Sequence, residues 1–164
     1  GLIGKRLAKL AQGIGMNVIA WTRSPDLEWA SANNVNYVEI DQLFRQADAI
    51  SLHLRLSPET RGMIGSERLS LMKPTAFLVN VARGGLIDED ALAAALGHGT
   101  IAGAALDTFG SEPLAANSAL RELPNSILSP HTAGTTTESL AQSLELVVGN
   151  TLAFLEGRIQ NPVE

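Results

Sequence analysis

The chain of 164 residues contains no cysteine, and only 4% of its residues are aromatic. The lack of cysteine excludes disulfides, thiolate catalysis and cysteine metal ligands, and we expect no metal site. With so few aromatic side chains, the core must be aliphatic, as is typical of parallel sheets covered by helices. No apolar run approaches the roughly 20 residues that cross a bilayer, and no charged-then-apolar leader is visible. We therefore expect a cytoplasmic protein with no membrane partner.

The sequence also lacks a concentration of charge of one sign. It has 12 Lys and Arg residues against 17 Asp and Glu residues, which gives a formal net charge of −5. The basic residues are scattered, whereas a nucleic-acid-binding surface needs them clustered. Nucleic acid is therefore not expected as a partner.

What is present is an alternation of short aliphatic runs and longer amphipathic stretches. Aliphatic runs predict strands at residues 17–21, 49–54, 76–80, 101–106 and 126–128. Helical spacing of apolar residues predicts helices at residues 7–14, 41–47, 66–72, 88–96 and 138–155. The polar segment 24–34 favours neither. Asp41, Ser66 and Asp88 are expected to cap the helices that they begin.

This alternation predicts parallel βαβ units with right-handed crossovers. The fold class is therefore α/β, a doubly wound parallel sheet of the Rossmann-like dinucleotide-binding type. In such a sheet ligands bind beyond the carboxyl ends of the strands. We interpret residues 1–164 as one nucleotide-binding domain, within which polar clusters follow the predicted strands.

The first four residues, Gly1-Leu2-Ile3-Gly4, have the spacing of the second and third glycines of a G-x-G-x-x-G fingerprint. The helix start behind them offers free N–H groups to phosphates. An ordinary helix start has the same two glycines, so this signal is weak alone. The first glycine and first strand of the fingerprint are missing. We expect a fragment that lacks that strand and binds cofactor weakly by itself.

The adenosine ribose is usually held by an acidic residue about 20 residues further on. That place is occupied by Thr22-Arg23-Ser24, which has no carboxylate. A guanidinium and two hydroxyls suit a 2′-phosphate, so NADP is tolerated or preferred on this interpretation. The alternative is that Arg23 stacks on adenine or points to water.

Three polar residues at three predicted strand ends suit hydride transfer to a keto acid. Arg83, beside two glycines, offers a fork that matches a carboxylate. His131 follows the last strand, and an imidazole both gives and takes a proton near neutral pH. Glu112 in the preceding loop would fix the tautomer of that imidazole. Each residue taken singly is more typical of a surface or loop position; their combination favours an active site.

Two further histidines and one aspartate are given lesser roles. His53 follows a strand and is expected to line the cofactor or to be structural, and His98 to place a favourable charge at a helix end. Asp107 is expected to orient loops or to contact the nicotinamide side.

Several segments resemble the D-isomer-specific 2-hydroxyacid dehydrogenase family. The matching runs cover nearly the whole chain and occur at residues 51–54, 57–62, 78–89, 103–109 with 112–113, and 129–134. The resemblance implies that Arg83 binds the substrate carboxylate and carbonyl, that His131 is the acid/base, and that Glu112 is its partner. It implies NAD or NADP as the cofactor, held by residues Gly1, Leu2, Ile3, Thr22, Arg23, Ser24, His53, Leu54, Arg55, Val81, Ala82, Asp107, Ala133 and Gly134.

The chain departs from the family pattern at three points. Arg55 stands where the family usually has proline, and Thr22 replaces the usual ribose-binding aspartate. The family's substrate-binding domain is absent, and residues 157–164 would lead back towards it. The resemblance also implies a homodimer formed through the nucleotide-binding domain and a small 2-hydroxy or 2-keto acid as substrate. Glyoxylate, hydroxypyruvate, phosphoglycerate and branched keto acids remain open.

Two other functions are compatible with the same residues. Transcriptional corepressors keep this fold, so the domain is alternatively a cofactor-sensing module without physiological turnover. An oligomerisation domain with an inactive cleft is the third hypothesis.

Overall fold

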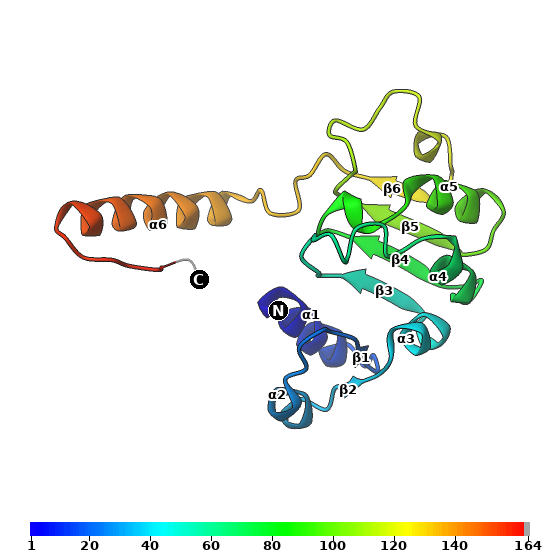
Figure 1. The fold of residues 1–164 in the computed structure, drawn as a ribbon, viewed down its shortest axis with the longest axis horizontal. Helices are drawn as coiled ribbons and strands as arrows, with labels where there is room; N and C mark the ends of the chain where they lie inside the picture. Colours follow the sequence, from blue (N-terminus) through cyan, green and yellow to red (C-terminus); the bar gives the residue numbers. More distant parts are fainter. Residues whose placement is uncertain (163–164) are drawn as a thin grey trace. The chain divides into compact units, whose positions relative to one another are not determined.

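The computed structural model describes residues 1–162, so the last two residues of the 157–164 segment lie outside it. The chain divides into two compact units, Gly1–Pro130 and His131–Glu164. The first unit contains two parallel sheets. The larger has the strand order β3-β4-β5-β6, with bounds Ala49–Leu52, Phe77–Asn80, Gly103–Leu106 and Ser126–Leu128 (Figure 1). The smaller pairs β1 (Ile19–Ala20) with β2 (Asn36–Tyr37).

Helices connect successive strands as far as β5, and a loop with a 3-10 turn makes the crossover from β5 to β6. The helices of this unit are α1 (Leu2–Gly13), α2 (Leu27–Ala32), α3 (Ile40–Gln46), α4 (Ser66–Leu71) and α5 (Glu89–Gly97), with short 3-10 turns η1 (Gly84–Leu86) and η2 (Ala119–Arg121). The predicted α/β class and its parallel sheet are confirmed. Strand β6 has the predicted bounds, whereas β4 and β5 begin one and two residues later than predicted and β3 ends two residues earlier.

Burial alternates along the central strands. Ile50 and Leu52 of β3 and Leu78 of β4 are buried, whereas Ser51 and Val79 between them are only partly covered. The buried side chains join those of α3, α4 and α5 in one hydrophobic cluster that includes Phe44, Leu69, Leu92, Leu96, Ile101 and Leu106. A second, small cluster of Ala8, Ala30 and Val35 joins α1 to α2 and β2. The larger core therefore fixes the strands whose ends carry the polar loops.

The helix starts assign one segment that the sequence left open and correct two predicted caps. Segment 24–34, left unassigned above, contains α2, whose cap Asp26 accepts a hydrogen bond from the Trp29 amide at 3.0 Å. Asp41 does not cap α3: the helix begins one residue earlier behind Glu39, and the Asp41 carboxylate instead pairs with Arg68 at 3.5 Å.

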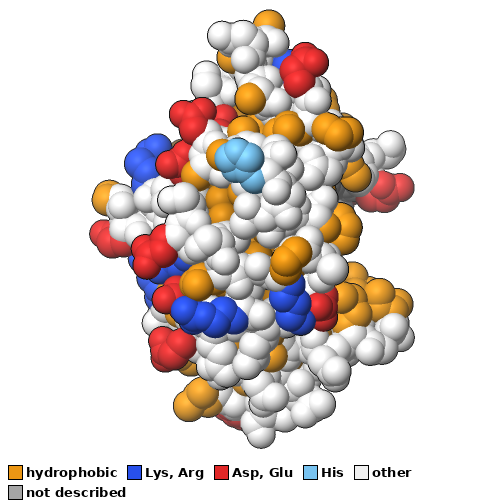
Figure 2. Space-filling view, turned by 90° about the vertical axis from the view of Figure 1, so that its right-hand side faces the viewer, with side chains coloured by type: hydrophobic (Ala, Val, Ile, Leu, Met, Phe, Trp, Pro, Cys, Tyr) orange, Lys and Arg blue, Asp and Glu red, His pale blue; other side chains and the backbone are white. Residues whose placement is uncertain are grey.

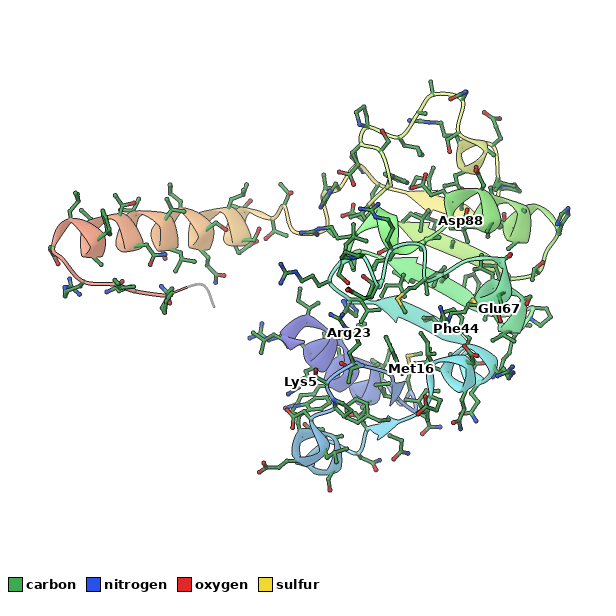
Figure 3. The ribbon with its side chains drawn as sticks, in the orientation of Figure 1. Lys5, Met16, Arg23, Phe44, Glu67 and Asp88 are labelled. Atoms are coloured by element: carbon green, nitrogen blue, oxygen red, sulfur yellow. The ribbon has the colours of Figure 1, made fainter. Side chains whose placement is uncertain are left out.

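Ser66 does not cap α4 either. It is the first helical residue, and the cap position is held by Gly65, whose carbonyl accepts from Leu69 at 3.0 Å. The prediction for Asp88 is confirmed. Its side chain accepts from the Ala91 amide at 3.0 Å at the start of α5, where Figure 3 labels it.

The second unit consists mainly of α6 (Thr137–Leu155), which confirms the predicted long helix. Thr136 and Ser139 form a reciprocal capping box at its start. The apolar positions expected on one side are all exposed, namely Leu140, Leu144, Val147, Val148, Leu152 and Leu155. Within residues 1–162, none of the helices combines the length and apolar character needed to cross a membrane.

Acidic, basic and hydrophobic side chains are interspersed over the face drawn in Figure 2. That face carries no continuous stripe of one charge. The distribution agrees with the scattered basic residues of the sequence.

Leu92→Ala tests the assigned core. Leu92 is 0% exposed in α5, so we expect truncation to lower the free energy of unfolding by about 2–5 kcal/mol through lost burial and a cavity. Leu27→Ala in α2, where Leu27 is 71% exposed, is the matched control and should change it by less than about 0.5 kcal/mol. Urea denaturation measures both, and equal stabilities would contradict the core described here.

Candidate active site

The four strands of the larger sheet are parallel, so their carboxyl ends share one edge. Beyond that edge lie the segments in which the sequence predicts site residues. Residues 53–55 follow β3, residues 81–83 follow β4, and residues 107–112 follow β5. Residues 129–130 follow β6 and end the first unit.

The buried side chain of Asn80 shapes the turn that carries Arg83. The Asn80 amide donates from Nδ2 to the Arg83 carbonyl at 3.0 Å, and its Oδ1 accepts from the Ala82 amide at 3.0 Å. Asn80 is 0% exposed, so both bonds lie away from water, where an unmade bond is costly. The Arg83 guanidinium donates to the Ala82 carbonyl at 2.6 Å and is itself exposed. The backbone of the turn is therefore fixed while the cationic head stays accessible.

Gly84 brings this turn against the loop after β5. A methyl carbon added at Gly84 would lie 1.9 Å from the carbonyl carbon of Phe109, so only glycine permits the approach. Glu112 in the same loop accepts from the Phe109 amide at 3.0 Å through Oε1. The structure thus brings together the backbone segments that carry Arg83 and Glu112.

Asp107 ties the loop after β5 to the end of β6. It is 4% exposed and accepts from the Ser129 hydroxyl at 2.6 Å, while the Ser129 amide donates to the Leu106 carbonyl at 3.0 Å. These bonds fit the expected role of Asp107 in orienting loops. They also fix the chain two residues before His131.

His131 is the first residue of the second unit, which also contains Ala133 and Gly134. Its backbone has φ 55°, in the left-handed region that few non-glycine residues adopt. The predicted meeting of His131 with Glu112 and Arg83 stays a prediction.

The start of α1 is the expected phosphate end of a cofactor site. Gly1 provides no side-chain cap, the first turn has no acidic residue, and Leu2 and Ile3 are exposed. A carbon added at Gly4 would lie 3.6 Å from the His53 side chain, which places this helix start beside the end of β3. Open N–H groups next to a strand end fit the pyrophosphate of a dinucleotide.

His53 is predicted to line the cofactor or to be structural. Its Nε2 lies 2.9 Å from the Ser51 hydroxyl. Burial lowers the pKa of His53 below its usual value, so the neutral ring is favoured. A neutral, bonded imidazole suits the role predicted for it.

The residues at the expected ribose end are more exposed. The Arg23 guanidinium lies 3.8 Å from the Glu59 carboxylate with 53% of its side chain exposed, and Figure 3 labels it. Thr22 Oγ1 accepts from the Ser24 amide at 3.4 Å. Arg55 is exposed, and its carbonyl accepts from Thr60 Oγ1 at 2.8 Å. This end therefore offers cationic and hydroxyl groups together with one competing carboxylate. The other predicted cofactor contacts, Leu54, Val81 and Ala82, lie in the segments after β3 and β4.

Sequence reasoning missed three residues that support the site. Asn80 bonds the turn of Arg83, Ser129 bonds Asp107, and Glu89 bonds the Gly110 amide. Each lies inside or directly beside a run that was singled out, but nothing in the sequence shows which atom it bonds. For Asn80 and Ser129 the available signal was a polar residue at the end of a strand, and for Glu89 it was an acidic residue at a helix start.

A parallel sheet with an open helix start and polar loops at its carboxyl edge defines a dinucleotide-binding α/β domain. The model of the family described as "D-isomer specific 2-hydroxyacid dehydrogenase, NAD binding domain" matches residues 1–133. The chain belongs to this family.

Individual relatives of the chain agree with this family assignment. The chain is 43% identical over 159 residues to a glyoxylate reductase of Thermococcus litoralis, covering 97% of this chain and 48% of that protein. The crystal structure of D-lactate dehydrogenase with NAD+ from Lactobacillus jensenii is similar with a TM-score of 0.91 and 31% identity, over 100% of this chain and 53% of that one. An acyclic imino acid reductase in complex with NADPH and D-Arg has a TM-score of 0.86 and 30% identity, over 100% and 51%. The chain thus spans about half the length of the relatives it matches.

Gly84→Ala tests the contact between the two loops. The added carbon overlaps the Phe109 carbonyl, so we expect the free energy of unfolding to fall by about 1–3 kcal/mol or more. We also expect weaker binding of a 2-keto acid, because the turn of Arg83 must move. Gly13→Ala is the control: it has no neighbour within 4 Å and should leave both unchanged within about 1 kcal/mol. Thermal unfolding and substrate titration measure the pair, and a Gly84→Ala protein that matches the control would contradict the close approach.

Proposed function

We propose that the protein containing this chain transfers a hydride between a nicotinamide dinucleotide and a D-2-hydroxy acid or 2-keto acid. The observation that carries the proposal is the close approach of Gly84 to Phe109, which sets the turn of Arg83 against the loop of Glu112 in a member of this family. The names of the relatives, among them glyoxylate reductase and D-lactate dehydrogenase, favour an enzyme over a cofactor-sensing module.

Each of the three polar residues has a chemical task in this proposal. The bound cofactor supplies the hydride to the carbonyl carbon of the keto acid. Arg83 binds the substrate carboxylate and polarises the carbonyl. His131 donates its proton to the carbonyl oxygen, and in the reverse direction it accepts the hydroxyl proton. Glu112 orients the imidazole.

The cofactor lies, in this proposal, along the carboxyl edge of the sheet. The start of α1 holds the pyrophosphate, and residues 22–24 hold the adenosine ribose or its phosphate. Residues 53–55, 81–82 and 107 are proposed cofactor contacts of the first unit, and Ala133 and Gly134 are proposed contacts of the second. The left-handed φ of His131 supports a functional position, because strained residues cluster at active sites.

The assembly and location of the protein are part of the same proposal. We propose a homodimer formed through the nucleotide-binding domain and a cytoplasmic enzyme that takes a small 2-keto acid. The glyoxylate reductase relative favours a short substrate side chain. Light scattering on the full-length protein measures the oligomeric state.

His131→Ala in the full-length protein tests the acid/base. We expect hydride transfer to fall by about 10²–10⁴-fold, the usual contribution of a general acid, while cofactor binding stays within about twofold. Turnover is followed by NADH or NADPH absorbance with a panel of 2-keto acids. His98→Ala, at the end of α5, is the control and should keep normal turnover. Normal turnover in the His131→Ala protein would refute the assignment, and a wild-type protein inactive on every keto acid would favour the cofactor-sensing module.

Arg23→Ala tests the preference between NADPH and NADH. Loss of the guanidinium should reduce kcat/KM for NADPH by about tenfold or more and leave NADH nearly unchanged, because only NADPH carries a 2′-phosphate. Arg45→Ala removes one exposed arginine of α3 and serves as the control for net charge. An unchanged NADPH to NADH ratio would support the alternative in which Arg23 stacks on adenine or faces water.

A further inference from the structure

We infer that Glu89 is a positioning residue, which holds the loop of Glu112 at its place beside the turn of Arg83. This inference rests on the proposed function. Glu89 opens α5, and its Oε1 accepts a hydrogen bond from the Gly110 amide at 2.6 Å. Gly110 lies two residues before Glu112 in the chain.

The loop is attached to one continuous segment at two points. The segment 84–89 contacts the loop at both of its ends. At its start the Gly84 backbone packs against Phe109, and at its end the Glu89 carboxylate accepts from the Gly110 amide. Two contacts on adjacent residues fix the direction of the loop, whereas a single contact leaves rotation about it. The Glu112 carboxylate, which accepts from the Phe109 amide, is therefore oriented through both.

The segment that carries Glu89 is packed into the core. Leu86 and Ile87 before it are buried, and Ile87 bridges to Ile64 as an isolated parallel pair. Leu92 in the next turn of α5 is also buried. A carboxylate on a segment packed into the core moves less than one on an exposed loop. It therefore holds its partner amide more firmly.

Glu89 is distinguished from its acidic neighbours by what it contacts. Asp88 is engaged as the cap of α5, on the Ala91 amide. Asp90 is exposed in the same first turn. Among residues 88–90, all within the described chain, Glu89 is the one with a hydrogen bond to the Glu112 loop. An acidic residue at a helix start is commonly explained by the helix dipole, but the bond to Gly110 gives this one a second task.

Substitutions at Glu89 separate reach from charge. Glu89→Asp keeps the negative charge at the helix start but is one methylene too short to reach Gly110. Glu89→Gln keeps the reach and an oxygen acceptor without the charge. If Glu89 positions the loop, Glu89→Asp and Glu89→Ala should lower kcat about tenfold or more, since small misplacements of catalytic groups are costly, and Glu89→Gln should stay within about threefold.

The experiment is done on the full-length enzyme with a 2-keto acid and the better of its two cofactors. We expect KM for the cofactor to stay unchanged in Glu89→Asp while kcat falls, because the loop of Glu112 moves and the cofactor contacts do not. Hydrogen exchange at the Gly110 amide should be faster in Glu89→Asp than in Glu89→Gln. Asp90→Ala removes a charge from the same helix turn and should leave kcat within about twofold.

A double-mutant cycle with Glu112→Gln shows whether Glu89 acts through Glu112. In that background Glu89→Asp should cause little further loss, because residues that act through one another are not additive. Normal turnover in Glu89→Asp, or the same loss with and without Glu112→Gln, would overturn the inference. These outcomes leave the proposed function standing as long as Glu112→Gln itself impairs turnover. If Glu112→Gln is fully active, the proposed role of Glu112 fails, and the role of Glu89 fails with it.

Discussion

The approach of the Gly84 backbone to the Phe109 carbonyl is the constraint on which the arrangement of the site depends. A backbone contact this close admits no side chain at residue 84, and it joins the ends of two neighbouring strands. It sets the turn of a cationic side chain, Arg83, against the loop of an anionic one, Glu112. Because the contact is between main chains, its geometry does not depend on the rotamer of any long side chain.

Two polar side chains hold the adjoining strand ends, and both are buried. Asn80 ends β4 and Asp107 follows β5, and the Asp107 amide donates to the Asn80 carbonyl at 2.9 Å. A buried polar group that loses its partner costs about 1–3 kcal/mol, so these residues tolerate little movement of the groups they bond. The bonded groups are the Arg83 turn in one case and Ser129 in the other. Hydrogen bonds from these two buried side chains thus fix the backbone of the Arg83 turn and the position of Ser129.

The sequence predicted the class of fold and most of its elements because aliphatic runs and helical spacing are local patterns. It placed Asp88 correctly as a cap but misplaced Asp41, because the choice between capping and pairing with Arg68 depends on a residue 27 positions away. The short helix α2 was missed because its local pattern is weak. It has six residues, of which only Ala30 is buried, and its cap Asp26 stands in a polar run. The bonds of Glu89 to Gly110 and of Asp107 to Ser129 likewise join residues 21 and 22 positions apart, which come close only when the chain folds.

The three residues proposed for catalysis are held in different ways. Arg83 and Glu112 are carried by segments that contact each other within the first unit, whereas His131 begins the second. The chain just before His131 is fixed, since Ser129 bonds both to Asp107 and to the Leu106 carbonyl. From there the imidazole depends on a backbone at φ 55°, which costs a non-glycine residue about 1–3 kcal/mol and persists only when its surroundings enforce it. Folding therefore stabilises a strained backbone at the residue proposed to move the proton. Ser129, two residues before His131, is hydrogen-bonded within the first unit.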